Sequence, residues 1–219
     1  MIRIYHHIWP GENNIGLDIG SNQTKRIFNN IKDEFTYHSN IVNYNENECH
    51  TLLKMLEEIR EFDDDDYILF LNNKGATKPN EPYQKEWREY LESSLIDDYK
   101  AHIQLLDGGF NTSGVLLNYK NSALDFMKYW GGNFYPGGFW WARVDTFNNM
   151  TINLNKHWKR WGTPMSRYSS ESNFFTFVYN WNPGVLYPSF ENFQIFYDYI
   201  TKENEINKES FNNRLKEFL

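Results

Sequence analysis

The feature that most constrains the fold is an apolar pentad, residues 67–71 (YILFL), which directly follows a run of aspartates. The pentad is too short for a buried helix and is bounded by turn residues, so it predicts a strand buried on both faces. Such strands are typical of parallel α/β sheets, in which ligands bind at the carboxyl ends of the strands. The residues at that end are Asn72, Asn73, Lys74 and Gly75. Two amides, a cation and a residue that tolerates positive φ suit an anionic, hydroxyl-rich ligand such as a sugar nucleotide.

The preceding aspartates, residues 63–66, are a possible metal site. They lie at the amino end of the predicted strand, however, on the side of the sheet away from the expected ligand. The pattern therefore favours a solvated acidic turn.

Hydrophobic periodicity predicts an α/β protein with a mostly parallel sheet flanked by helices. The expected strands are residues 2–9, 35–44, 67–71, 102–106, 115–119 and 139–144. The expected helices are residues 24–32, 46–61, 83–95, 123–130, 190–200 and 209–219, with a loop over 11–22. No repeat or low-complexity linker divides the chain, which predicts one domain over 1–219 whose helical extension, 190–219, packs on it.

Charge and cysteine content narrow the class of protein. The net charge of -7 argues against a general nucleic-acid binder, because such proteins carry an excess of Lys and Arg. The single Cys49 excludes an internal disulfide and a zinc-finger framework. No span of 18 apolar residues occurs, so we expect no membrane span and a cytoplasmic protein, in the host cytoplasm if the source is viral.

Two further positions are candidates at the ligand edge. His6 and His7 are adjacent in the first strand and must point to opposite faces, so one of them could meet the ligand while an ordinary buried histidine is the alternative for either. Asp107 follows the strand expected at 102–106 and is itself followed by two glycines, which would allow it to approach a metal ion closely.

A glycine-rich loop and an aromatic strand make up the second unusual stretch, residues 131–145 (GGNFYPGGFWWARVD). The glycines permit close approach of the backbone to a bulky ligand. Trp140 and Trp141 face opposite sides of the strand. One ring is expected in the core, and the other could form a platform for a sugar.

A carboxylate near the C-terminus is a candidate base. Ser169 or Ser170 is expected to cap a helix, with Glu171 in its first turn. The helix terminus would stabilise the Glu171 carboxylate as the anion and keep it available as a general base. A capping-box glutamate without a chemical role is the alternative.

Four segments in this order resemble the small GT-A glycosyltransferases of bacterial polysaccharide loci and large DNA viruses, including the chlorella-virus capsid-glycosylating enzymes. The segments are residues 48–52 (ECHTL), 67–75 (YILFLNNKG), 136–142 (PGGFWWA) and 167–171 (RYSSE). The resemblance extends over residues 2–179 and implies a GT-A, Rossmann-like fold.

The resemblance also implies a nucleotide-sugar donor, most often a UDP-sugar, and transfer to a hydroxyl of a glycan or glycoprotein. It adds Thr51 to the expected donor contacts, which are otherwise His6 and residues 72–75, and it implies Gly138 and Arg167 as sugar or acceptor contacts beside the two tryptophans. Histidine and serine of the family motif are replaced here by Asn72 and Asn73, and Gly138 stands where the family has Asn.

The family commonly uses Mn²⁺ or Mg²⁺ held by an Asp-X-Asp pair, which does not follow the central strand here. Asp107 could supply a carboxylate to the ion, or Lys74 could neutralise the leaving diphosphate directly. The expected reaction is a single displacement with inversion, in which Glu171 acts as the base. A glycoside hydrolase with Asp107 or Asp145 as second acid, and a non-catalytic carbohydrate-binding module, are the alternatives.

Overall fold

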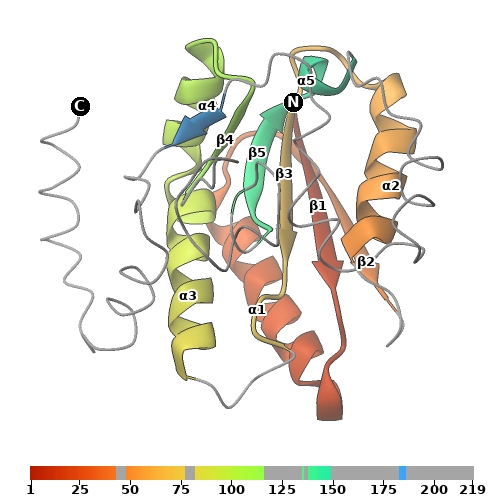
Figure 1. Cartoon of the computed structure of the whole chain (residues 1–219), viewed down its shortest axis with the longest axis vertical. Helices are drawn as coiled ribbons and strands as arrows, with labels where there is room; N and C mark the ends of the chain where they lie inside the picture. The colour runs from red at the N-terminus through yellow and green to blue at the C-terminus, as the bar shows by residue number, and fades with distance from the viewer. Residues whose placement is uncertain (43–47, 77–81, 116–134, 136–137, 149–182, 186–219) are drawn as a thin grey trace, which may run out of the picture.

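The computed structural model describes residues 1–42, 48–76, 82–115, 135, 138–148 and 183–185. Within them the chain forms a mixed six-stranded sheet in the order β2-β1-β3-β5-β4-β6, with helices on both faces (Figure 1). The strands are β1 (Ile2–Ile8), β2 (Phe35–Ile41), β3 (Tyr67–Asn72), β4 (Thr112–Gly114), β5 (Trp140–Arg143) and β6 (Pro183–Val185). The helices are α1 (Ile15–Asn30), α2 (Glu48–Glu58), α3 (Pro82–Glu92), α4 (Tyr99–Asp107) and α5 (Asp145–Asn148), with short turns η1 (Glu12–Asn14), η2 (Ile59–Glu61) and η3 (Ser93–Asp97). The predictions for 123–130, for 190–219 and for the Glu171 segment lie outside the described residues.

The first three strands pair in parallel, as the sequence predicts, and so do β4 and β6 at the other edge of the sheet. β1 pairs in parallel with β2 on one side and with β3 on the other, and Tyr5 is opposite His38 and Phe70 in the two registers. β5 then pairs antiparallel to β3, and β4 antiparallel to β5. The sheet is therefore mixed, and the carboxyl ends of β1 and β3 lie together at its lower edge in Figure 1.

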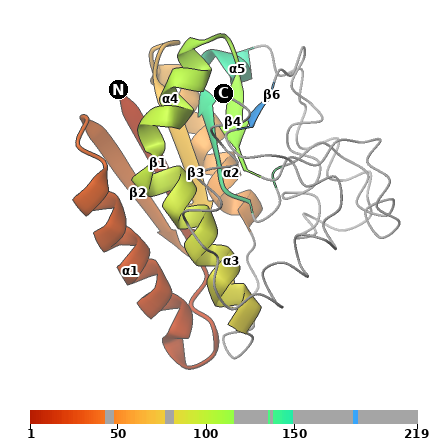
Figure 2. The same ribbon diagram turned by 90° about the vertical axis from the view of Figure 1, so that its left-hand side faces the viewer.

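β3 is buried on both faces, as its apolar pentad predicts. Ile68 and Phe70 pack in a core with α2, whereas Leu69 and Leu71 pack in a second core with α1, α3 and α4. One face of the sheet is thus covered by α2 and the other by α1, α3 and α4, and the latter three are seen in front of the strands in Figure 2.

The predicted loop over 11–22 is wrong, because α1 begins at Ile15; the helix predicted over 24–32 is confirmed up to Asn30 but was placed too late in its start. Two glycines in its first turns lower the helical propensity of the sequence. Both serve close packing: a Cβ at Gly16 would lie 1.9 Å from the Trp9 carbonyl oxygen, and one at Gly20 would lie 2.9 Å from the Ile8 side chain. A preference for helix in this segment therefore depends on tertiary contact with the end of β1.

The strand predicted over 102–106 is also wrong, because these residues belong to α4. Its buried residues Tyr99, His102 and Leu106 are three and four positions apart, which is helical spacing. β4 lies just before the short strand expected at 115–119, of which only Val115 is described, outside any strand. Among the helices that the structure describes, none combines the length and apolarity needed to cross a membrane.

Candidate functional site

The candidate site is the carboxyl end of β1 and β3. The chain leaves β1 through α1 to β2 on one side, and then returns through α2 to β3 on the other side. Open α/β sheets bind ligands at such a change of direction, outside the carboxyl ends of the strands. The structure brings to this edge the residues predicted as donor contacts, His6, Thr51, Asn72, Asn73, Lys74 and Gly75, together with Gly138, which was predicted as a sugar or acceptor contact.

Asn73 links the ends of the two strands through its side-chain amide. Its Oδ1 accepts a hydrogen bond of 3.1 Å from the Trp9 backbone N–H. Its Nδ2 donates to the carbonyl oxygens of Trp9 at 2.6 Å and Gly16 at 2.8 Å. These bonds use both ends of the amide to hold β1, α1 and β3 together. Asn73 is 5% exposed, and this arrangement assigns it a structural role at the edge.

The two adjacent histidines point to opposite faces, as predicted, and both are buried. His6 contacts the Tyr37 hydroxyl at 2.7 Å and Gln23 Oε1 at 2.9 Å, and Gln23 Nε2 donates to the Asn72 carbonyl oxygen at 3.0 Å. Burial lowers the pKa of His6 to about 4, against the opposing effect of its hydrogen bond with Gln23. His6 is therefore a neutral residue of the core, which is the alternative the sequence leaves open for it.

His7 lies on the α2 face in a second polar cluster. Its Nδ1 is 2.9 Å from the Thr51 hydroxyl, which also accepts from Asn40 Nδ2 at 2.9 Å. Burial, with smaller contributions from the nearby His6 and His50, lowers the pKa of His7 to about 3. Next to this cluster, Asn72 Nδ2 donates to Glu48 Oε1 at 3.3 Å.

Gly138 lies directly against Asn72. It has φ of 70°, and a Cβ at this position would be 2.7 Å from Asn72 Nδ2. The aromatic strand that follows contributes no exposed ring, because Trp140 and Trp141 are 4% and 0% exposed. Trp140 stacks on Phe70, and Trp141 Nε1 donates to the Leu95 carbonyl oxygen in the opposite core. The prediction that they face opposite sides is confirmed, whereas the prediction of a sugar platform is wrong for this arrangement.

Lys74 is the one predicted cation at this edge. The side chain is half-buried, and its Nζ lies 4.4 Å from the centroid of the Trp87 ring. In the described part of the chain, no carboxylate forms an ion pair with Lys74. Its carbonyl oxygen accepts a hydrogen bond of 2.9 Å from Arg88 Nη1. Gly75 has the positive φ that the sequence predicts, at 86°, and packs against α3.

Asp107 does not join this site, and its prediction as a metal ligand at the ligand edge is wrong. It ends α4, and the hydroxyl of Tyr67 donates to its Oδ1. Because Tyr67 begins β3, Asp107 lies at the amino end of the sheet, opposite to Lys74. Asp145 lies at the same end, where Arg143 contacts it. Within the described ranges, no cluster of three or more His, Cys, Asp or Glu residues could hold a metal ion.

Two predicted residues, Arg167 and Glu171, lie outside the described residues. Three residues at the site, Gln23, Trp87 and Arg88, were missed by the sequence reasoning. The i,i+4 spacing of Arg88 and Glu92 on a predicted helix is a readable signal for an ion pair. The contact of Arg88 with Lys74 has no signal in the sequence, because it depends on how α3 packs.

The sequence matches no protein-family model, and no curated protein or solved structure shows a significant match to it.

Proposed function

We propose that this protein is a GT-A glycosyltransferase that transfers a sugar from a UDP-sugar to a hydroxyl of a glycan or glycoprotein. The observation that carries the proposal is Lys74, a half-buried ammonium at the carboxyl end of β3, beside the change of direction between β1 and β3. The order of the four sequence segments that resemble this family supports it.

A lysine in this position suits a diphosphate. The ammonium is partly removed from water and rests on the electron-rich face of Trp87 rather than on a carboxylate of the described residues. A positive charge of this kind attracts an anion more strongly than a fully solvated one, because the local dielectric constant is lower. As a compact point charge, it would stabilise the negative charge that develops on the leaving nucleoside diphosphate.

The proposed reaction is a direct displacement. The acceptor oxygen attacks the anomeric carbon, the bond from that carbon to the diphosphate oxygen breaks, and its electron pair leaves with UDP. Glu171 takes the proton of the acceptor hydroxyl. One displacement inverts the anomeric configuration. No step here passes through a metal ion, and a requirement for Mn²⁺ or Mg²⁺ stays a prediction from the resemblance.

Nucleotide binding provides the test. Calorimetric titration with UDP, uridine, GDP and CMP, each with and without Mn²⁺, is expected to show binding of UDP and much weaker binding of uridine, which lacks the diphosphate. Binding of glycans without any nucleotide would instead favour a carbohydrate-binding module. Release of free sugar from an oligosaccharide without nucleotide would favour a glycoside hydrolase.

The role of Glu171 has its own test. Glu171→Gln is expected to lower turnover by at least about 10²-fold while UDP binding is kept, since general base catalysis contributes at least this factor. Glu89→Gln is the matched control, because the Glu89 side chain is 54% exposed on α3 and pairs with Lys85. A Glu171→Gln enzyme as active as this control would contradict the assignment, and so would a product with retained configuration.

A further inference from the structure

α3 holds Lys74 at two points. Arg88 Nη1 donates to the Lys74 carbonyl oxygen at 2.9 Å, and the Trp87 ring lies 4.4 Å from Lys74 Nζ. The next residue also packs on the guanidinium, because a Cβ at Gly75 would lie 3.2 Å from Arg88 Nη1. Backbone and side chain of Lys74 thus both rest on consecutive residues of one helix.

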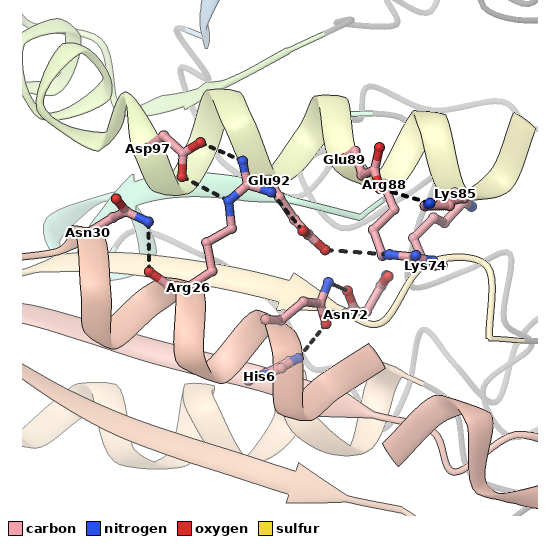
Figure 3. Close-up of polar contacts among 11 residues, drawn as sticks. His6, Arg26, Asn30, Asn72, Lys74, Lys85, Arg88, Glu89, Glu92 and Asp97 are labelled. Atoms are coloured by element: carbon pink, nitrogen blue, oxygen red, sulfur yellow. Dashed lines mark hydrogen bonds and ion pairs between the residues drawn. The ribbon is translucent and has the colours of Figure 1, made fainter. Parts of the chain in front are cut away.

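Arg88 is in turn oriented by a buried carboxylate. The side chain of Glu92 is 9% exposed, and its Oε1 lies 3.6 Å from Arg88 Nε. Its Oε2 accepts a hydrogen bond of 3.0 Å from Arg26 Nη1 on α1. Figure 3 shows Arg88 between Glu92 and Lys74, with Arg26 reaching Glu92 from the other helix.

Arg88 makes these polar contacts from a largely buried position, because its side chain is 14% exposed. Arg88 also lines a pocket of 450 Å³ between α1 and α3. The pocket is lined by Ile19, Asn22, Arg26, Lys85, Arg88, Glu89, Glu92 and Ser93. An arginine suits this position because its planar fork donates a hydrogen bond to the carbonyl oxygen with Nη1 while Nε lies within ion-pair distance of Glu92.

We propose that Arg88 is a positioning residue for Lys74, which it holds at the carboxyl end of β3 so that the ammonium meets the diphosphate of the donor. This inference rests on the proposed function. Arg88 acts through the backbone of Lys74 and does not touch the donor. Glu92 contributes by directing the fork of Arg88 toward that backbone.

The first test measures the position of Lys74 without any nucleotide. Arg88→Gln is compared with Lys85→Gln, which also removes one cation from α3 but changes a side chain that is 66% exposed and paired with Glu89. Acylation of Lys74 by an N-hydroxysuccinimide ester, followed by mass spectrometry, is expected to be several-fold faster in Arg88→Gln and unchanged in Lys85→Gln. Equal labelling rates in the wild type and Arg88→Gln would overturn the proposal.

A conservative variant separates positioning from charge. Arg88→Lys keeps a cation beside Glu92, and so keeps the fold, but one ammonium cannot reach both Glu92 and the Lys74 carbonyl oxygen. We expect faster labelling of Lys74 here as well, together with weaker UDP binding. Wild-type labelling and wild-type UDP affinity in Arg88→Lys would show that only the charge matters, which contradicts the proposal.

The second test measures the functional consequence by UDP titration. Arg88→Gln is expected to weaken UDP binding about tenfold, which corresponds to one hydrogen bond that involves a charged group. In a Lys74→Met background the same substitution is expected to have no further effect, because its action passes through the ammonium. An equal loss in both backgrounds would overturn the positioning role.

The two readouts also distinguish this inference from the proposed function. Arg88-dependent labelling in a protein that binds no nucleotide would leave the contact in place but overturn its role in donor binding, together with the glycosyltransferase itself. Normal UDP binding with labelling independent of Arg88 would leave the function in place and overturn the inference alone.

Discussion

The two ends of the sheet use charge in different ways. At the amino end, Asp66 is buried and pairs with the N-terminal ammonium at 2.7 Å and with Arg3 at 2.7 Å. Arg143 likewise pairs with Asp65 and Asp145. At the carboxyl end, the buried histidines are neutral, and the Glu48 side chain accepts a hydrogen bond from the amide of Asn72. Lys74 there rests on an aromatic ring rather than on a carboxylate of the described residues. The cations named at the amino end are thus engaged in ion pairs, whereas the Lys74 ammonium at the carboxyl end is the cation that we propose meets an anionic ligand.

Two neighbouring residues at the carboxyl end also differ in how their polar groups are used. Asn73 and Lys74 are adjacent in the sequence, and both were predicted to contact the donor. The amide of Asn73 is used by three hydrogen bonds to the backbone, whereas the ammonium of Lys74 has none with the described residues. Whether a polar group is already hydrogen-bonded within the protein is therefore a better guide to ligand binding than its proximity to the edge of the sheet.

The largest expected effect is the change of the unfolding free energy with pH. Burial lowers the pKa of His6 to about 4, and those of His7 and His102 to about 3. In the unfolded chain these histidines have a pKa near 6.5 and take up a proton more readily than in the folded protein. The folded state is therefore fully stable above pH 6.5 and loses stability as the pH falls toward 4. Between pH 7 and 5 each histidine is expected to cost about 2 kcal/mol of unfolding free energy. The raised pKa of Glu92, caused by burial, opposes this trend.

Urea unfolding at pH 7 and pH 5 measures this loss. In His102→Gln the difference between the two pH values is expected to shrink by about 2 kcal/mol, because one buried imidazole is gone. An unfolding free energy that does not change between pH 7 and 5 in the wild type would show that these histidines are protonated in the folded protein.

The amino end should respond strongly to loss of its buried carboxylate. Asp66→Ala leaves the guanidinium of Arg3 and the terminal ammonium without their partner, and is expected to cost about 3 kcal/mol of unfolding free energy. Asp65→Ala, whose side chain is 91% exposed, is expected to cost less than about 1 kcal/mol. Thermal or urea unfolding checks both values. Equal stability of the two variants would remove the contrast between the ends.

A smaller effect is expected at the carboxyl end from Asn73→Ala. The substitution leaves backbone groups of Trp9 and Gly16 without their partner and is expected to cost about 2 kcal/mol. Asn30→Ala removes an exposed amide that donates to the Arg26 carbonyl oxygen, shown in Figure 3, and serves as the control. Loss of UDP affinity in Asn73→Ala without any loss of stability would show that Asn73 binds the donor after all.

Much of the architecture was readable from local patterns. The pentad in β3 and the amphipathic periodicity of α2 and α3 predicted their types correctly, since apolar residues in these segments follow the period of the element they form. The start of α1 is not predictable from the local sequence, because Gly16 lowers the helical propensity there and is needed only for its close contact with Trp9. α4 was misread because its apolar run is short enough to fit a strand.

The site was predictable in position but not in detail. Residues after a buried parallel strand must lie at its carboxyl edge, and this placed Asn73 and Lys74 correctly. Whether each side chain has a structural role depends on contacts with residues far away in the sequence, such as Trp9 and Arg88. Asp107 was misplaced for a simpler reason, since its prediction depended on a strand that is a helix.

The most direct measurement of the central claim is a UDP titration of Lys74→Met beside Lys85→Met, with the folded state of both verified by circular dichroism. Lys85→Met is expected to bind UDP as the wild type does. Lys74→Met is expected to bind about 30-fold more weakly, the loss of one interaction with a charged phosphate group. Equal affinity of the two variants for UDP would contradict the claim that Lys74 binds the diphosphate.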